Sequence, residues 1–369
     1  MKFDILRCHG TDRGQWQSLV RRLPPFKRDI HYLPEYGEIY EKTFGFEPCL
    51  AFFGDQDKFV IQPFVKRCLN DLPFLRHVGP ETHYHDISNP YGYGGPVANT
   101  ESMDGFDQLI DAFNRQFCSY CRDENFASEF TALSPLTPES SLEMYTARLG
   151  AKFEKNVVVV DLDKCDRTIW RQFSRGHKSN IKKAQKNGVT VERLPVTPEN
   201  IELFHCMYLN TMQRHQAASR WFFKKAYFQN CCDLLGSDNV SLFVSKVEGA
   251  IASAYLLMHA FSTAYYHFGA SESRYFGLRP NNLLMYETIL WAKSKGFLHY
   301  HLGGGVSTSR DDPLMQFKRG FSDTLRPLYV YYRVHHRDVY EELCRLKREH
   351  EKHNGMPSDE RDYFPFYRR

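Results

Sequence analysis

The segment HYHLGGGVSTSRDDPLMQFKRG, residues 299–320, joins three consecutive glycines to a Phe317–Lys318 pair that begins twelve residues after Gly305. A lysine ammonium held in a fixed position can stabilise the negative charge that develops on a reacting oxygen. Further cations lie close to Lys318 along the chain: Arg310, Arg319 and Arg326. We therefore expect this region to hold an anion or an oxyanion. The alternative is that Lys318 is an ordinary solvated charge.

The glycines Gly303–Gly305 do not match a nucleotide-binding pattern. A dinucleotide fingerprint needs G-x-G-x-x-G at the start of a helix, and a P-loop needs a Gly-Lys-Ser/Thr ending. Here the following VSTSRDDPLMQ is expected to form a loop before it forms a helix. Glycine permits positive φ and a close approach of the backbone. The triplet is therefore expected to end a strand with little side-chain bulk.

A second candidate is the densest positive stretch of the chain. Eight basic side chains lie between residues 164 and 186: Lys164, Arg167, Arg171, Arg175, Lys178, Lys182, Lys183 and Lys186. Such a ridge suits the phosphates of a nucleotide substrate or of RNA. The alternative is a helix face that simply faces water.

Two further segments have the composition of binding loops. NPYGYGGP, residues 89–96, offers Tyr91 and Tyr93 for stacking on a sugar or base, and the amides of Gly94 and Gly95 for a phosphate. It could equally be a turn packed on a core. GASESRYFGLRPNN places Arg274 and Arg279 before the expected start of a helix at Asn281 and Asn282. Helix N-termini bind anions, so a pyrophosphate or an acyl donor is expected there.

Searches for an activated nucleophile fail, since G-x-S-x-G, H-E-x-x-H and the kinase motifs do not occur in the sequence. The sixteen histidines are scattered, and no metal is assigned. The residues therefore favour a mechanism based on positioning and oxyanion stabilisation, without a bound cofactor.

Composition indicates how these residues are supported. A chain of 369 residues is expected to form two domains, and its net charge of +4 confines any anion site to a local patch. The ten cysteines show no disulfide framework, and Cys118 and Cys121 lie within a helical pattern, so we expect reduced thiols and a cytoplasmic location. The apolar region 240–268 contains Lys246 and Glu248, which favours strands over a membrane span.

The pattern of elements predicts an α+β class in which two parts share the order strand, helix, strands, helix, strand. In the first part we expect a helix at 12–23, strands at 48–54 and 58–69, a loop at 83–99, a helix at about 106–122 and a strand at 127–133. In the second part we expect strands at 155–162, 189–194, within 240–271, at 299–305 and at 325–336, and helices at 166–188, 197–215, 220–236 and 279–296. A charged helix at 337–353 follows.

The order of several segments resembles the Fem-type branch of the GNAT acyltransferase superfamily, which includes the aminoacyl-tRNA-dependent transferases of peptidoglycan bridge synthesis. The segments are SNIKKAQKNGV, TMQRH, RWFFKKAYF, AYYHFGAS, LRPNNLLMYETILWAKSKG, HYHLGGG and LMQFKRGF, within about 150–325. NPYGYGGP looks like a loop of Fem-like proteins that are tied to surface polysaccharides.

The resemblance implies two tandem GNAT-like domains, at 1–150 on the acceptor side and 151–335 on the acyl-transfer side, with a C-terminal helix and tail at 336–369. It implies an N-acyltransferase that moves an aminoacyl group from aminoacyl-tRNA to an amine of a cell-envelope or polysaccharide precursor, such as a nucleotide-sugar or peptidoglycan-type acceptor. Peripheral contact with the inner membrane would then be compatible with a chain lacking a membrane span.

The same resemblance implies roles for particular residues. Lys318, with Phe317, would lie near the transferred carbonyl, and Arg214 would grip an anionic acceptor. The remaining substrate-binding candidates are Tyr91, Tyr93, Gly94, Gly95, Tyr266, His267, Asn281, Asn282 and Gly304. The candidates for donor phosphates are Lys178, Lys182, Lys183, Arg274 and Arg279.

Two alternatives stay open at this point. One keeps the fold but uses an acyl-CoA donor to acetylate an amino sugar, although SRYFGLRPNN departs from the usual glycine-rich form of the coenzyme A loop. The other is a non-catalytic GNAT-like scaffold that only binds a precursor.

Overall fold

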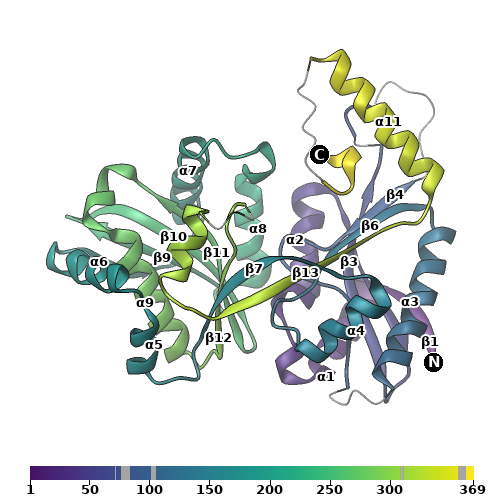
Figure 1. Ribbon diagram of the computed structural model, residues 1–369, viewed down its shortest axis with the longest axis horizontal. Helices are drawn as coiled ribbons and strands as arrows, with labels where there is room; N and C mark the ends of the chain where they lie inside the picture. Colours follow the sequence, from purple (N-terminus) through teal and green to yellow (C-terminus); the bar gives the residue numbers. More distant parts are fainter. Residues whose placement is uncertain (71, 76–83, 101–104, 308, 310, 356–362) are drawn as a thin grey trace. The chain divides into compact units, whose positions relative to one another are not determined.

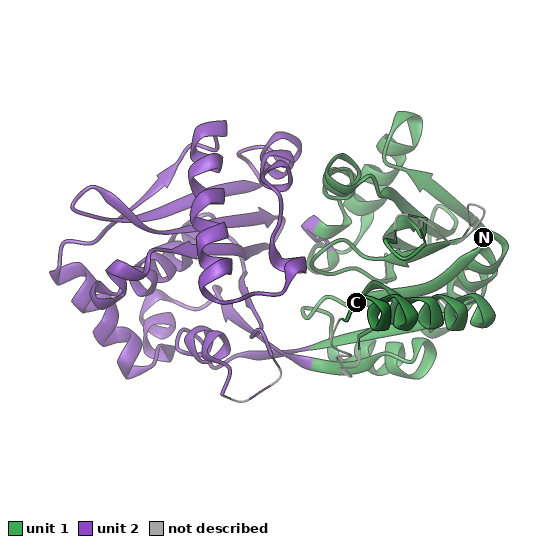
Figure 2. Cartoon of the chain, turned by 90° about the horizontal axis from the view of Figure 1, so that it is seen from above, with its two compact units in different colours: residues 1–27, 31–154, 328–369 green, residues 28–30, 155–327 purple. Residues whose placement is uncertain are grey.

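The computed structural model describes residues 1–70, 72–75, 84–100, 105–307, 309, 311–355 and 363–369. The chain forms two compact units, coloured separately in Figure 2. Unit 1 comprises residues 1–27, 31–154 and 328–369, and unit 2 comprises residues 28–30 and 155–327. None of the helices in these described ranges is long and apolar enough to cross a membrane.

Unit 1 is built on a mixed sheet. In spatial order its strands are β1 (Lys2–Arg7), β2 (Glu47–Gly54), β3 (Phe59–Cys68), β4 (His85–Ser88), β6 (Phe126–Ala132) and β13 (Leu325–Val334), and β5 (Val97–Ala98) pairs with β3. Strands β4 and β6 are parallel, whereas β1–β2, β2–β3, β3–β4 and β6–β13 are antiparallel. Its helices are α1 (Gly10–Arg22), α2 (Pro34–Phe44), α3 (Phe106–Asp123), α4 (Glu139–Leu149) and α11 (Arg337–His353).

Unit 2 is built in the same way. Its strands in spatial order are β7 (Lys152–Asp161), β12 (His299–Gly303), β11 (Thr263–Ser271), β10 (Ala250–Ala260), β9 (Val240–Val247) and β8 (Thr190–Leu194). The helices are α5 (Asp166–Gln172), α6 (Arg175–Lys186), α7 (Pro198–Arg214), α8 (Lys225–Leu235), α9 (Pro280–Ser294) and α10 (Pro313–Arg319). Strands β11 and β12 are parallel and are joined by α9, whereas β7–β12, β10–β11, β9–β10 and β8–β9 are antiparallel.

The two units contain the same order of strands and helices (Figure 1). Unit 1 runs β1–α1–α2–β2–β3–β4–α3–β6–α4, and unit 2 runs β8–α7–α8–β9–β10–β11–α9–β12–α10. The strand that follows α4 is β7, which pairs with β12 of unit 2, and the strand that follows α10 is β13, which pairs with β6 of unit 1. Each sheet is thus completed by the strand that follows the other unit's last helix. The predicted pair of α+β units is confirmed.

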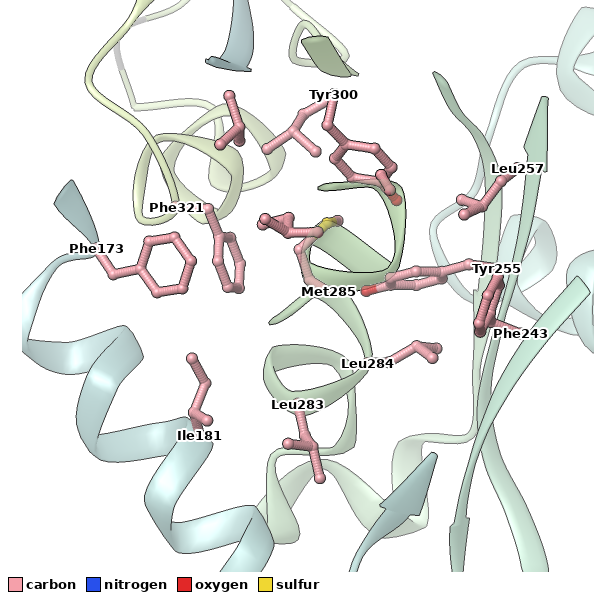
Figure 3. Close-up of a cluster of buried hydrophobic side chains, with 14 of the residues drawn as sticks. Phe173, Ile181, Phe243, Tyr255, Leu257, Leu283, Leu284, Met285, Tyr300 and Phe321 are labelled. Atoms are coloured by element: carbon pink, nitrogen blue, oxygen red, sulfur yellow. The ribbon is translucent and has the colours of Figure 1, made fainter. Parts of the chain in front are cut away.

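The core of unit 2 explains why α9 is apolar on nearly every side. Leu283, Leu284 and Met285 from this helix are buried against α6 and the sheet, as Figure 3 shows. A helix that is apolar all round has to be covered by neighbours on all sides. Ile181 from α6 and Tyr300 from β12 belong to the same cluster. The site-bearing strands β11 and β12 are therefore held by a fully packed layer.

Several sequence predictions need correction. The segment 83–99 is not only a loop, because β4 and β5 lie within it; His83 is outside the described residues. The single helix expected at 166–188 is two helices, broken at Phe173, because Ser174 caps a new N-terminus by accepting the His177 amide. Helices α2 and α4 had not been expected.

The C-terminal segment belongs to unit 1 and is not a separate tail. Leu343 and Cys344 of α11 pack with Ala127 and Tyr367 in one buried cluster. Apart from residues 28–30, which belong to unit 2, the units change at residues 154/155 and 327/328, whereas the expected division was into 1–150, 151–335 and 336–369.

Candidate active site

The site begins where two parallel strands stop pairing. Strands β11 and β12 pair at Thr263–His299, Ala264–Tyr300 and Tyr265–His301, and the pairs end there although β11 continues to Ser271. Opposite β10 the register shifts between Leu256–Phe268 and Leu257–Tyr266, which leaves His267 as a bulge. Bulges redirect side chains and are frequent beside active sites. The backbone of β11 beyond Tyr265 is thus released from β12 at one end of the unit 2 sheet.

Lys318 lies at this end of the sheet. It is 5% exposed, and its Nζ donates to the carbonyl oxygen of Gly304 at 2.7 Å and lies 5.4 Å from the centre of the Tyr266 ring. Strand β12 ends at Gly303, whose φ is +79° and whose added Cβ would lie 3.2 Å from Lys318 Nζ. The expectation that the glycines end a strand without side-chain bulk is confirmed, and the space is used by the lysine.

The protonation of Lys318 is unusual. Burial lowers its pKa from 10.5 to about 7, with a further contribution from the nearby ammonium of Lys155 and an opposing one from the Asp312 carboxylate. Near neutral pH both the ammonium and the amine are therefore populated. A nascent oxyanion would favour the ammonium, because an opposite charge raises the pKa of a buried amine.

Asp312 closes the loop that follows the glycines. Its carboxylate caps α10 by accepting the Met315 amide at 2.8 Å and also accepts the Ser307 amide at 2.7 Å. Gly305 packs directly against it, since an added Cβ would lie 2.6 Å from the carboxylate. Burial alone would raise the pKa of Asp312, but these hydrogen bonds lower it overall. The role of Asp312 was missed, although Asp followed by Pro313 is a typical start of a helix.

His177 supports the other side of α10. Its Nε2 hydrogen-bonds the carbonyl oxygen of Phe317 at 2.9 Å, and its Nδ1 lies 3.0 Å from Ser174 Oγ. Burial lowers the pKa of His177, against the effect of the Phe317 carbonyl, so we assign a neutral ring that donates from Nε2. Gly320 is in contact with this ring. His177 therefore connects α6 to the residue before Lys318, and sequence reasoning missed it.

The Phe317 ring, which precedes Lys318 in the sequence, packs against the core of unit 2. It is 5.4 Å from the His177 ring and 5.3 Å from the Phe321 ring, measured between centroids. It also borders the buried cluster of unit 2. These contacts give Phe317 a clear part in orienting the helix that carries Lys318.

Two consecutive residues of β11, Tyr266 and His267, contact different parts of unit 2. Tyr266 lies edge-on to Tyr255 at 4.7 Å and is the ring beneath Lys318. His267 instead hydrogen-bonds Tyr227 of α8, with 2.9 Å between Nε2 and the hydroxyl. Of this predicted pair, Tyr266 therefore lies beside Lys318, whereas His267 contacts Tyr227.

Arg214 is tied to the end of β11. Its Nη1 donates to the Ser271 carbonyl oxygen at 2.9 Å, its Nη2 to Ser271 Oγ at 3.2 Å, and its guanidinium lies 5.2 Å from the Phe276 ring. The side chain still reaches the surface. Arg214 therefore fixes the strand end, and a role toward an acceptor would come in addition.

The start of α9 has the chemistry of an anion site. Asn281 accepts the Tyr255 hydroxyl through its carbonyl oxygen at 3.2 Å, whereas the buried Nδ2 of Asn282 has no hydrogen-bond partner among the described residues. Arg279 stands at the N-cap with φ +62° and is exposed. Arg274, also exposed, stacks on Tyr275 at 4.9 Å. Free donors and positive side chains thus meet at one helix N-terminus.

The basic ridge is an exposed helix face. Lys182 and Lys183 of α6 face solvent, while Ile181 and Ala184 are buried in the core. Lys178 is half-buried and donates to the Arg171 carbonyl oxygen at 2.9 Å. The ridge therefore presents its charge outward, whatever it binds.

One of the three arginines that neighbour Lys318 in sequence lies away from it. Arg326 contacts Asp161 at 3.7 Å, close to His299 at the opposite end of β12 from Gly303. Arg319 is exposed, and Arg310 lies outside the described residues.

The NPYGYGGP loop is packed into unit 1. The Gly94 amide donates to the Ala132 carbonyl oxygen at 2.8 Å, and the Tyr32 hydroxyl donates to the carbonyl oxygens of Gly94 and Gly95 at 3.1 and 2.9 Å. The expectation of free amides is therefore wrong for Gly94. Tyr93 lies against His31 with 5.4 Å between ring centres, and the Tyr91 amide donates to the Tyr40 hydroxyl at 2.7 Å.

The NPYGYGGP loop can be compared with the loop at the same position in unit 2. It lies between β4 and α3, the position that the loop between β11 and α9 takes in unit 2. In unit 1 a Gly94–Leu133 bridge continues the parallel pairing past the end of β4. In unit 2 the pairing ends at Tyr265, and Lys318 lies nearby. The described residues therefore place the candidate active site in unit 2.

Comparison with known proteins indicates the class to which this fold is related. A family model for an acetyltransferase (GNAT) domain matches residues 171–319. The UDP-N-acetylmuramoylpentapeptide-lysine N(6)-alanyltransferase of Weissella viridescens is 24% identical over 252 residues, which cover 63% of this chain and 70% of that protein. The lipid II:glycine glycyltransferase of Staphylococcus haemolyticus strain JCSC1435 is 24% identical over 231 residues, covering 44% of this chain and about half (54%) of that protein.

A solved structure is similar over nearly the whole chain. The crystal structure of FemX superimposes with a TM-score of 0.69 at 18% identity and covers 93% of this chain and 99% of its own. The fold and the family-model match thus indicate a GNAT acyltransferase with two tandem units. Within that superfamily the chain is similar to these two transferases of peptidoglycan precursors and to FemX.

Proposed function

We propose that this acyltransferase moves an aminoacyl group from aminoacyl-tRNA to a primary amine of a peptidoglycan precursor. The observation that carries the proposal is the buried Lys318 where the β11–β12 pairing ends. The acceptor class is suggested by the two relatives, one named for the lysine of a UDP-N-acetylmuramoylpentapeptide and the other for lipid II and glycine. We place the reaction in the cytoplasm, where charged tRNA is made.

The chemistry requires one new bond and one broken bond. The acceptor nitrogen attacks the carbonyl carbon of the donor ester, and a C–N bond forms while the carbonyl oxygen becomes an oxyanion. The Lys318 ammonium donates to that oxygen. Collapse of the intermediate expels the ribose hydroxyl of tRNA, and the proton lost by the amine passes to this leaving oxygen directly or through water. One such donor is worth about 3–4 kcal/mol.

The donor would bind through two features of unit 2. The exposed ridge of α6, with Lys182 and Lys183, suits the RNA backbone because phosphate binding is driven by lysine and arginine charge. The N-terminus of α9, with Arg279 and Asn282, suits a second group of phosphates or the acyl carbonyl. The acceptor would be held near Arg214 at the end of β11.

A second candidate keeps the site and changes the donor to an acyl-CoA. The observation in its favour is the α9 N-terminus, where the unpartnered Asn282 Nδ2 and the exposed Arg279 would suit a pyrophosphate. The GNAT match of residues 171–319 supports the general class but does not choose between donors.

Side-by-side assays separate the candidates. The purified full chain is incubated with a UDP-linked muramoyl pentapeptide and either charged tRNA or acetyl-CoA, and the product is identified by mass. Aminoacylation of the lysine side chain with tRNA alone supports the proposal, and acetylation with acetyl-CoA alone supports the second candidate. A double variant, Lys182→Glu with Lys183→Glu, should weaken tRNA binding and reduce its salt dependence. If the double variant transfers the aminoacyl group from tRNA at the wild-type rate, the proposed role of the ridge is contradicted.

A further inference from the structure

Three potential metal ligands meet in unit 1, far along the chain from the residues of the proposed reaction. One potential ligand atom from each of Cys8, His9 and Glu41 lies within 4.8 Å of the other two. The His9–Glu41 pair is 2.6 Å apart and the Cys8–Glu41 pair is 3.7 Å apart. A thiol, an imidazole and a carboxylate are the three side-chain types that zinc selects most often.

The fold brings these residues together for local reasons. Strand β1 ends at Arg7 and α1 begins at Gly10, so Cys8 and His9 form the short connection between them. Gly10 takes φ +60°, and the Asp12 carboxylate accepts the Arg7 amide at 3.0 Å, which fixes the turn. His9 occupies the N-cap of α1 without capping it through its side chain. Its ring is directed instead to Glu41 in α2.

The surroundings hold the connection in place and balance its charge. Arg13 donates to the Cys8 carbonyl oxygen at 3.2 Å and forms ion pairs with Glu35 at 2.9 Å and Glu38 at 2.7 Å. The nearest guanidinium is thus already compensated by two carboxylates. Cys8 is buried, whereas the His9 side chain is 54% exposed, so the group is anchored at one side and open to solvent at the other.

We propose that Cys8, His9 and Glu41 bind a zinc ion, with solvent as a fourth ligand. Tetrahedral zinc with bonds of about 2.0–2.3 Å places neighbouring ligand atoms about 3.3–3.6 Å apart. The Cys8–Glu41 distance already suits this geometry, and the His9–Glu41 contact would open by less than the reach of either flexible side chain. The Cys8 thiol proton is released to solvent when the thiolate coordinates the metal.

The ion would join the β1–α1 connection to α2. These two parts are separated by 32 residues between His9 and Glu41, which explains why no metal site was expected from sequence spacing. A bound ion stabilises the state that binds it by mass action. Unit 1 should therefore resist unfolding more strongly when zinc is present.

Cobalt substitution tests the site directly. The full chain, stripped with a chelator, is titrated with Co²⁺, whose bond to a thiolate gives a charge-transfer absorption. We expect one equivalent to bind with this absorption, and Zn²⁺ to displace it and raise the melting temperature. Cys8→Ala should abolish the absorption, and His9→Ala and Glu41→Gln should each lower the affinity at least about tenfold.

A matched control comes from Cys206, an exposed cysteine whose Sγ lies 3.6 Å from Glu202 Oε1. Cys206→Ala should leave the absorption and the affinity unchanged. If Cys8→Ala does not fold, the partly exposed His9 and Glu41 still decide the question. Equal cobalt affinity in the wild type, His9→Ala and Glu41→Gln would overturn the proposal, as would loss of the absorption only in Cys206→Ala.

Discussion

At the scale of single residues, the site depends on how Lys318 is kept buried and still able to carry charge. Its ammonium donates to the backbone carbonyl oxygen of Gly304, and the centre of the Tyr266 ring lies 5.4 Å away. Neither is a full negative charge, so burial dominates and the pKa falls to about 7. A carboxylate paired with Lys318 would hold the ammonium in the ground state, whereas this environment would leave it available to an oxyanion in the proposed reaction.

This burial has a consequence for stability against pH. The pKa of Lys318 is about 7 in the folded chain and near 10.5 when unfolded, so the unfolded state binds more protons between these values. The free energy of unfolding should therefore rise with pH in this window, by at most about 1.4 kcal/mol per pH unit from this group. Denaturant titrations of the wild type and Lys318→Met at pH 6 to 9 measure the difference. A difference that does not change with pH would contradict the assignment.

In the proposed reaction His177 would act as a positioning residue, because its Nε2 hydrogen-bonds the carbonyl oxygen of Phe317. Loss of this hydrogen bond should let the last turn of α10, which carries Lys318, move. Small displacements of a reacting group lower the reaction rate strongly. We expect His177→Ala to lower turnover by about 10- to 100-fold with little change in donor affinity, and His177→Gln to recover part of the loss. Rapid-quench assays on the folded fraction measure this effect. A loss of stability alone, with normal turnover, would make His177 merely structural.

At the scale of elements, the short helix α10 is as important as the strands. It begins at the Asp312 cap and ends beside His177, and Lys318 projects from its last turn. Asp312→Ala removes the cap and should destabilise the chain by about 0.5–2 kcal/mol. Asp311→Ala is a matched control, since Asp311 is the exposed neighbour of the cap. Thermal unfolding of both variants checks this expectation, and equal melting temperatures would contradict it.

Sequence reasoning identified the elements with strong periodicity and missed those fixed by single contacts. The apolar run of α9 and the alternating strands of β9 to β11 were predicted because burial imposes their patterns. Strand β4 was missed because HDIS is short and polar, and its Asp86 is buried only through ion pairs with Arg67 and Arg368. The break before α6 was missed because it depends on the Ser174 cap and not on Pro or Gly.

The candidate site shows the same division. Lys318 was predicted from its place beside the glycines and from the family resemblance, since residue type and spacing are local information. The contact of His177 with Phe317 joins residues far apart in the sequence, as does the contact in unit 1 where Asn89 Oδ1 accepts the Ala132 amide at 2.9 Å. Such contacts exist only after the sheet has formed, so no local pattern predicts them.

At the scale of the whole molecule, duplication and strand exchange define the architecture. Two copies of one path each receive their last strand from the connection that follows the other copy. Neither sheet can therefore be completed by a continuous piece of chain. The exchange could not be expected from the sequence, because a strand carries no local mark of the sheet it joins.

The C-terminus is part of this architecture because it anchors in unit 1. Tyr367 is buried with its hydroxyl 2.6 Å from Ser128 Oγ, and Arg368 pairs with the buried Asp86 at 2.6 Å. Arg368→Ala removes one of the two ion pairs of the buried Asp86 and leaves Arg67 as its counter-charge. This loss of a charged hydrogen bond should destabilise the chain by about 1.5–3 kcal/mol, whereas Arg337→Ala, at an 85% exposed side chain, should change it little. Chemical denaturation measures both, and similar effects would contradict this account of the C-terminus.

The most direct test of the central claim is the single-turnover rate of acyl transfer by Lys318→Ala, with the accepted donor and acceptor saturating. Loss of an oxyanion donor should lower this rate by about 10²–10³-fold while donor and acceptor affinities change little. Lys293→Ala is the control, because Lys293 also donates to backbone carbonyls, those of Leu162 and Lys164, at 3.0 and 2.7 Å. A folded Lys318→Ala variant that transfers the acyl group at the wild-type rate would contradict the claim that Lys318 stabilises the reacting oxygen.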